Sequence, residues 1–117
     1  MPDTQKDLHK KLYGKIGEDL VVKKLKKLGY RLIKRNFTTP YGEADIIVFK
    51  DGVTVFVEVK ARNNDYYGEP KDSVGYKKQG KYRKIASYYM QKKGESEISF
   101  AVAEVMGEEV NVIFDAF

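Results

Sequence analysis

The sequence predicts an α/β fold, a mixed central β-sheet flanked by helices in the order α-β-β-β-α-β-β. Three observations support this class: a long helical pattern near the start, an Asp-Gly dipeptide between two apolar strands, and a second helical pattern between strands. A strand, a helix and another strand usually form a right-handed crossover within one sheet. The 117 residues, 42% of them hydrophobic, fit one domain spanning 1–117 with a substantial core.

The first helix is expected over residues 5–28, where apolar residues recur three and four positions apart. Gly29 is in the C′ position that ends many helices. Gly14 and Gly17 interrupt the apolar stripe, which predicts a bend or a close contact there.

Three strands should follow, at residues 30–37, 43–50 and 53–61. A turn containing Pro40 separates the first two, and Asp51-Gly52 joins the second and third as a two-residue hairpin loop.

The rest of the chain should hold a polar loop, a helix and two strands. The loop spans residues 62–71, and the helix is expected to be capped by Ser73 and to end at about Lys93 before Gly94. The strands are expected at 98–106 and 109–114.

Composition excludes several classes of function. The absence of cysteine rules out disulfides, thiolate catalysis and Cys-ligated zinc sites. A single histidine, His9, makes histidine-based catalysis a poor expectation. There is no apolar run of about 18 residues, so we expect a cytoplasmic protein without a membrane partner. The net charge of +5 is compatible with a polyanionic partner.

The hairpin register brings two carboxylates face to face. If Lys50 pairs with Val53, then Asp45 faces Glu58 in a non-hydrogen-bonded pair, whose Cα atoms lie about 4.5 Å apart. The opposite face is then apolar. Its expected core pairs are Ala44–Val59, Ile46–Val57 and Val48–Val55.

Opposed carboxylates repel, and in a semi-buried position one of them would have to take up a proton. A divalent cation removes both problems, and Mg²⁺, with Mn²⁺ as a substitute, suits one or two carboxylates plus waters. Lys60 points to the same side as Glu58 and is placed to hold an attacking water. The alternative is an ordinary ion pair at a sheet edge, in which Lys60 neutralises Glu58 or Glu43, and a bulge would break the register.

Two further charges fall on apolar helix stripes. Glu18 shares a stripe with Val21 and Leu25, so it either joins the metal site or pairs with a lysine of its own helix. Lys78 lies on the apolar side of the second helix, aimed at a phosphate or extended along the core with its ammonium in water.

The second helix is rich in cations and tyrosines. Between residues 77 and 93 there are seven lysines and arginines and no acidic residue, which predicts a phosphate-contacting surface or a plainly solvated face. The candidate nucleic-acid contacts are Lys77, Lys78, Gln79 and Lys81, with Arg62 in the preceding polar loop.

Five stretches carry a family resemblance: GKIGEDLVVKKLKKLGYRLIKRNF, TPYGEADIIV, VFVEVKAR, SVGYKKQGKYRKIASYY and the terminal DAF. In these the chain resembles the restriction-endonuclease-like PD-(D/E)XK superfamily. It is most similar to the bacterial YraN-like proteins and distantly similar to archaeal Holliday-junction resolvases. Ala44 replaces the motif's proline, and Ala101 stands where relatives often have an acidic residue.

The resemblance implies a restriction-endonuclease-like fold with Glu18, Asp45, Glu58 and Lys60 as the active-site set. Lys78 and Gln79 match an additional helix motif of this family.

The expected function is a Mg²⁺-dependent endonuclease that acts on DNA, with branched or structured DNA as one substrate class. Asp45 and Glu58 would hold the metal with Glu18 and the Val59 carbonyl. Paired cuts in a junction would require a two-fold homodimer. Two alternatives stay open: a nucleic-acid-binding module that keeps the nuclease fold without cutting, and a purely structural ion-pair network.

Overall fold

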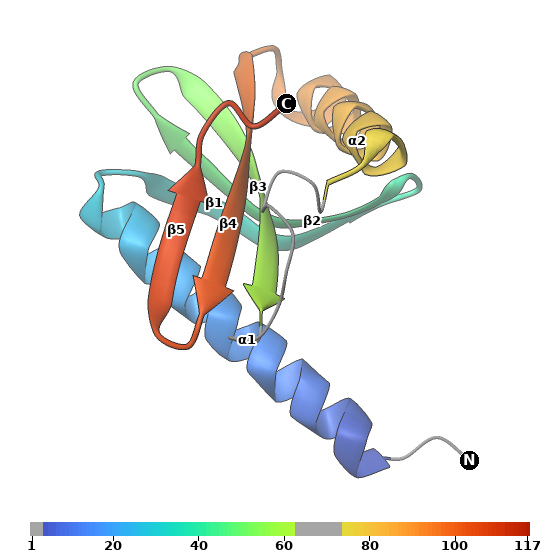
Figure 1. Ribbon diagram of the computed structural model, residues 1–117. Coiled ribbons are helices and arrows are strands. Elements are labelled where there is room, and N and C mark those ends of the chain that lie inside the picture. The colour runs from blue at the N-terminus through green and yellow to red at the C-terminus, as the bar shows by residue number, and fades with distance from the viewer. Residues whose placement is uncertain (1–3, 63–73) are drawn as a thin grey trace.

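The computed structural model describes residues 4–62 and 74–117, with side chains described for residues 14–61 and 74–117. Two helices and five strands lie within them, in the predicted order (Figure 1). Their bounds are α1 Thr4–Lys27, β1 Arg31–Thr39, β2 Gly42–Lys50, β3 Val53–Arg62, α2 Tyr76–Lys93, β4 Glu97–Met106 and β5 Glu109–Ile113.

The strands form one mixed sheet in the order β1-β2-β3-β4-β5. All neighbours are antiparallel except β3 and β4, which run parallel and are the pair that α2 separates in the sequence. This confirms the predicted mixed sheet and the predicted strand–helix–strand crossover.

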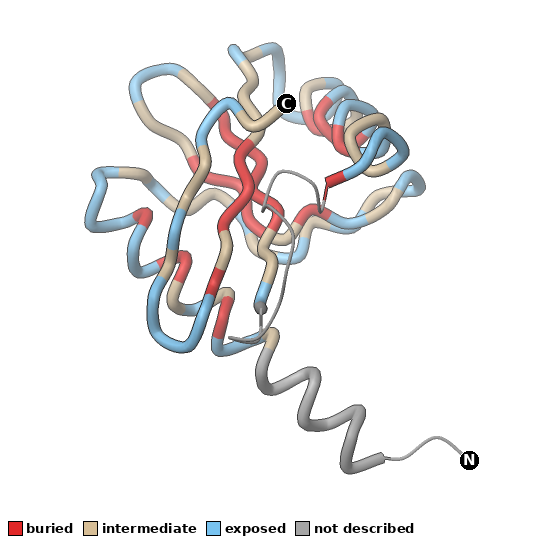
Figure 2. Tube along the Cα trace, viewed as in Figure 1, coloured by how far each residue is buried: buried red, intermediate tan, exposed pale blue. Residues whose placement is uncertain are grey.

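Each helix covers its own face of the sheet, and each face has its own core (Figure 2). Val21 and Leu25 of α1 pack against Ile46, Val57 and other apolar residues of β2, β3 and β4. On the second face, α2 contributes four residues to a more aromatic core. These are Tyr82, Ile85, Ala86 and Tyr89, packed with Ala44, Ile47 and Phe56.

The predicted helix ends are partly confirmed. Gly29 has a positive φ of 93° and follows the last turn of α1. The N-cap of α2 is Gly75, without a side-chain cap, so the expected Ser73 cap is wrong in position, and Ser73 itself lies outside the described residues. The predicted close contact is present at Gly17, where an added Cβ would lie 3.8 Å from Val105, but not at Gly14, which faces open space.

The hairpin between β2 and β3 has the predicted register, from Lys50↔Val53 to Ile46↔Val57. Asp51 and Gly52 both have positive φ, as a two-residue type I′ loop requires. The pairing ends at Ile46↔Val57, one pair short of Asp45 and Glu58. The expected Ala44–Val59 core pair is wrong, because Ala44 packs in the α2 core and Val59 against the α1 core.

The break in β2 has a counterpart in β1. Asn36 lies opposite Asp45 between the pairs Arg35↔Ile46 and Phe37↔Ala44, and its φ of 53° is in the left-handed region. The regular alternation of side chains is therefore interrupted at Asp45, where β2 turns away from β3.

Neither helix within residues 4–62 and 74–117 is long and apolar enough to cross a membrane.

Candidate active site

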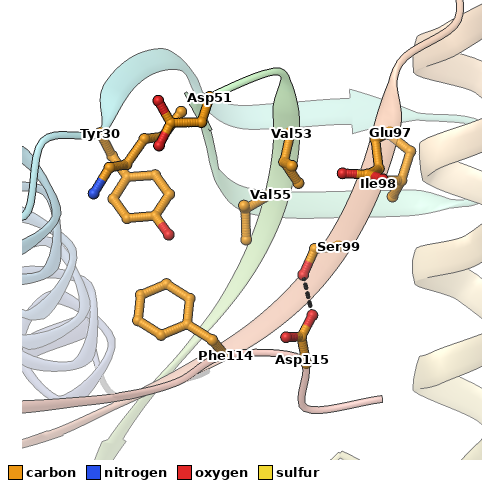
Figure 3. A pocket seen from close by; sticks show the side chains of 10 residues that line it. Tyr30, Asp51, Val53, Val55, Glu97, Ile98, Ser99, Phe114 and Asp115 are labelled. Atoms are coloured by element: carbon orange, nitrogen blue, oxygen red, sulfur yellow. Dashed lines mark hydrogen bonds between the residues drawn. The ribbon is translucent and has the colours of Figure 1, made fainter.

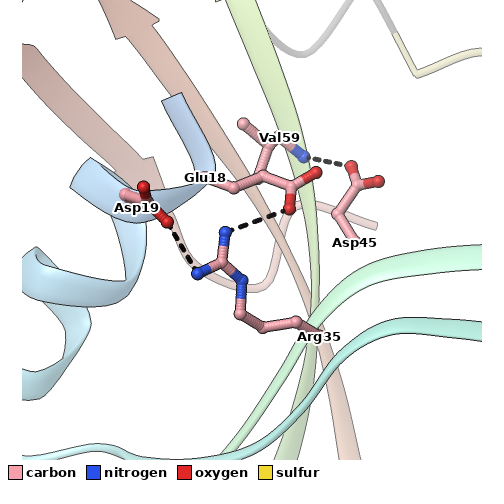
Figure 4. A network of polar contacts seen from close by, with 5 residues as sticks. All are labelled: Glu18, Asp19, Arg35, Asp45 and Val59. Atoms are coloured by element: carbon pink, nitrogen blue, oxygen red, sulfur yellow. Dashed lines mark hydrogen bonds and ion pairs between the residues drawn. The ribbon is translucent and has the colours of Figure 1, made fainter. Parts of the chain in front are cut away.

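Asp45 is fixed by a backbone hydrogen bond at the point where β2 leaves β3. The Val59 N–H donates to its Oδ2 at 2.8 Å (Figure 4). In a continued ladder this N–H would face the Ala44 carbonyl, because alternate pairs from Lys50↔Val53 onward are hydrogen-bonded. The Asp45 carboxylate therefore replaces a main-chain acceptor and is held against β3 beside Glu58.

Glu58 is a carboxylate in the interior, with 4% of the residue exposed. Its Oε1 accepts a hydrogen bond from the Tyr82 hydroxyl at 3.3 Å. Its Oε2 forms an ion pair with the Lys78 ammonium. A buried carboxylate needs such a cationic partner to offset the cost of its burial.

Asp45 and Glu58, hereafter the acid pair, are close enough to share a hydrogen bond. Burial, followed by the hydrogen bond with Glu58, raises the pKa of Asp45 to about 8, while the Val59 N–H opposes the shift. Negative charge on Glu58 and Glu18 contributes further. The predicted conflict between the two carboxylates is therefore present, and at neutral pH Asp45 needs either a proton or a cation.

Two ammonium groups lie beside the acid pair. Burial lowers the pKa of Lys60, and the neighbouring Lys78 charge lowers it further, while Glu58 and Asp45 raise it. Lys78 is 42% exposed along its side chain and reaches Glu58 from α2. The Lys78 ammonium therefore contacts a carboxylate of the site, a partner that neither interpretation of the sequence named.

Glu18 has a partner that the sequence analysis did not propose. Its Oε1 lies 3.4 Å from Nη2 of Arg35, and Nη1 of Arg35 lies 2.7 Å from Oδ1 of Asp19 (Figure 4). The hydrogen bond with Asp19, together with Glu18, raises the pKa of Arg35 against the effect of burial. The expected alternative, in which Glu18 pairs with a lysine of its own helix, is wrong, because Glu18 forms its ion pair with Arg35 of β1.

Among the described residues, no group of three or more Asp, Glu or His side chains is arranged to hold one metal ion. The structure brings Asp45, Glu58, Lys60 and Lys78 together and leaves Glu18 turned toward Arg35. Mg²⁺ does not require three carboxylates, because it commonly uses one or two and retains waters. The acid pair and the adjacent Val59 carbonyl fit such an ion, and the two carboxyl groups held close together, with Glu58 buried, are the observation that supports the fit.

Four of the five predicted nucleic-acid contacts lie in the first half of α2. Lys77 and Lys81 are exposed. The Gln79 side chain donates to the Val74 carbonyl at 3.0 Å, so its amide ties the start of α2 to the preceding segment. The side chain of Arg62 lies outside the described residues.

Tyr82 belongs to the site although the sequence analysis gave it no role. It is 1% exposed, and its hydroxyl donates to Glu58. Burial, followed by the charges of Glu58 and Asp45, raises the pKa of Tyr82, so it remains a neutral donor. Its spacing of four residues from Lys78 was the available signal, since it places both side chains on one helix face.

Comparison with known proteins places these residues in a family. The model of the uncharacterised protein family UPF0102 matches residues 17–113, a range that includes the acid pair, Glu18, Lys60 and Lys78. The chain belongs to the UPF0102 family.

Relatives in this family match over nearly their whole length. A UPF0102 protein of Alkaliphilus metalliredigens is 41% identical over 112 residues, covering 92% of this chain and 98% of the relative. One from Thermodesulfovibrio yellowstonii is 40% identical, covering 89% and 94%. One from Clostridium perfringens is 41% identical, covering 93% and 96%.

The raised pKa of Asp45 gives this UPF0102 protein a testable pH dependence. Between about pH 4 and pH 8 the folded protein holds a proton that the unfolded chain releases, so this group destabilises the fold increasingly as pH rises. In metal-free buffer we expect Asp45→Asn to raise the free energy of unfolding by about 1 kcal/mol or more at pH 8, and by less at pH 5. Urea unfolding with EDTA at both pH values measures this.

Glu97→Gln, a change at an exposed residue of β4, is the matched control and should alter stability little at either pH. A loss of stability in Asp45→Asn without metal would contradict the expectation and favour a structural ion-pair network.

Proposed function

We propose that this UPF0102 protein is a metal-dependent endonuclease of the restriction-endonuclease-like PD-(D/E)XK superfamily that hydrolyses phosphodiester bonds in DNA. Branched or otherwise structured DNA is the proposed substrate class. The observation that carries the proposal is the acid pair, two carboxylates held together on the α2 face of the sheet with Lys60 and Lys78 beside them.

The acid pair and the Val59 carbonyl are the proposed ligands of Mg²⁺, with Mn²⁺ as a substitute. When bound, this ion supplies positive charge next to the scissile phosphate and lowers the pKa of a coordinated water. Glu18 lies near enough to affect Asp45 electrostatically, and its role is to complete or orient the coordination shell. The ion pair with Arg35 competes with this role.

Lys60 is the proposed residue that positions the attacking water. It follows Glu58 by two positions on β3, so both side chains point to one side of the sheet. Burial, followed by the charge of Lys78, lowers the pKa of this ammonium from its ordinary value. A positively charged group there also stabilises the charge that develops on phosphorus.

Lys78 links the substrate to the acid pair. Its ammonium neutralises Glu58 in the protein alone, and a DNA phosphate offers it an alternative anion. The exposed Lys77 and Lys81 on the same helix would contact neighbouring phosphates, which gives salt-dependent binding with little sequence preference.

A second candidate function, a nucleic-acid-binding module that does not cut, is favoured by one observation. The Lys78–Glu58 ion pair already supplies the acid pair with a cation, so a metal is not the only means of compensating its charge. Both functions use the basic surface of α2, and they differ in whether a divalent ion displaces Lys78.

Replacing Glu58 with Gln tests the catalytic assignment. Gln keeps an acceptor for the Tyr82 hydroxyl but removes the charge that would bind the metal, so we expect cleavage to fall at least about 100-fold while DNA binding persists. The assay uses linear, single-stranded, flapped and four-way DNA with Mg²⁺ or Mn²⁺.

Glu97→Gln serves as the matched control, because it removes a carboxylate from an exposed position of the parallel neighbour β4. Cleavage by Glu58→Gln at the wild-type rate would remove the assignment.

Lys78→Gln distinguishes the two candidate functions. Removing an ammonium that contacts Glu58 should tighten Mn²⁺ binding by about tenfold, because a like charge within a few Å costs on the order of 1 kcal/mol or more. Calorimetric titration with Mn²⁺ measures the affinity. Lys77→Gln, at the neighbouring exposed position, should leave it nearly unchanged. Equal affinities in the two variants would contradict metal binding at the acid pair.

A further inference from the structure

A groove separate from the acid pair lies between α2 and the turn that joins β1 to β2. Its volume is about 460 Å³, within the usual range for small-ligand sites. We call it the α2 groove, and its lining residues are Tyr41, Arg83, Lys84, Ser87, Tyr88 and Gln91. None of these is a proposed ligand of the metal or of its attacking water.

Two tyrosine rings form the aromatic part of the α2 groove. Tyr41 is 46% exposed, and its ring centroid lies 6.4 Å from that of Tyr88 at an interplanar angle of 76°. Tyr88 also packs against Phe37, with centroids 6.2 Å apart, which anchors its ring to β1. The groove thus presents an exposed aromatic ring beside an anchored one.

Cations surround these rings. The Lys84 ammonium lies 5.8 Å from the centroid of Tyr41, and the Lys92 ammonium lies 5.0 Å from that of Tyr88. Arg83 also lines the groove, and α2 contains no acidic residue along its length. The surroundings therefore favour an anion attached to a flat, stackable group.

A nucleotide has this chemistry, but only when its base is unpaired. Bases in a duplex are stacked on one another, whereas unpaired bases stack on aromatic side chains while basic groups follow the backbone. Ser87 and Gln91 supply a hydroxyl and an amide in the same groove for the edge of a base.

A larger cavity, of about 610 Å³, lies at the start of β3, away from the acid pair (Figure 3). The charges that line it differ from those of the α2 groove. Three acids, Asp51, Glu97 and Asp115, line it. The Lys50 ammonium there already donates to the Leu28 carbonyl at 2.7 Å. This acidic rim would repel phosphate, so this cavity does not suit a nucleotide.

We propose that the α2 groove binds an unpaired nucleotide of a DNA strand, with its base stacked on Tyr41 and in edge contact with Tyr88, and its phosphate on Arg83 or Lys84. The inference rests on the proposed function and specifies its substrate class as DNA with single-stranded character. Tyr88 lies ten residues after Lys78, about 15 Å along the helix. A strand seated in the groove can therefore run along α2 to the acid pair.

The test measures binding without cleavage. Fluorescence anisotropy with a labelled oligo(dT), and with the duplex of equal length, is recorded in EDTA for the wild type, Tyr41→Ala and Tyr88→Leu. We expect each variant to bind oligo(dT) about tenfold more weakly and to bind the duplex within about twofold of the wild type. Thermal unfolding confirms that Tyr88→Leu remains folded, and Tyr41→Ala changes the more exposed ring.

Tyr76→Ala is the matched control, because Tyr76 is 90% exposed on α2 and does not line the groove. Unchanged oligo(dT) affinity in both groove variants, or an equal loss in Tyr76→Ala, would overturn the proposal. Tighter binding of oligo(U) than of oligo(dT) would overturn its assignment to DNA. The binding assay contains no metal, so its result does not depend on whether the protein is a nuclease. If the protein cleaves DNA but the groove variants bind oligo(dT) as the wild type does, only the groove proposal is refuted.

Discussion

The hydrogen bond from the Val59 N–H to the Asp45 carboxylate is the constraint on which the rest of the site depends. It lies where main-chain pairing between β2 and β3 stops, after Ile46↔Val57. Without it, β2 would separate from β3 with no contact to direct Asp45 toward Glu58. With it, one carboxylate is fixed against the strand that carries the other, and their mutual repulsion is relieved only by a proton or a nearby cation.

That repulsion explains the composition of the surroundings. Burial and the charge of Glu58 raise the pKa of Asp45, so the pair favours any nearby positive charge. Lys60 from β3 and Lys78 from α2 provide it, and the Tyr82 hydroxyl binds the remaining Glu58 oxygen. A site that holds two acids and two ammonium groups together is suited to binding a phosphate and a hard cation at once, because each has a complementary partner already in place.

Much of this arrangement could be predicted from the sequence, because it depends on periodicity and on one turn. Asp51-Gly52 fixed the hairpin register, and the register placed Asp45 near Glu58. The end of β2–β3 pairing at Asp45 could not be predicted from periodicity. It depends on the Asp45 side chain replacing a backbone acceptor and on the left-handed conformation of Asn36 in the neighbouring strand. The ion pair between Arg35 and Glu18 could not be predicted either, because it depends on how α1 lies against β1.

The most direct test of the central claim, that the acid pair is a cation site, is anomalous X-ray scattering from crystals grown with Mn²⁺. Our account predicts an anomalous peak that contacts the carboxylates of Asp45 and Glu58 and the Val59 carbonyl, with the Lys78 ammonium displaced from Glu58. Crystals at millimolar Mn²⁺ with no peak at this position, and with Lys78 still paired to Glu58, would contradict it.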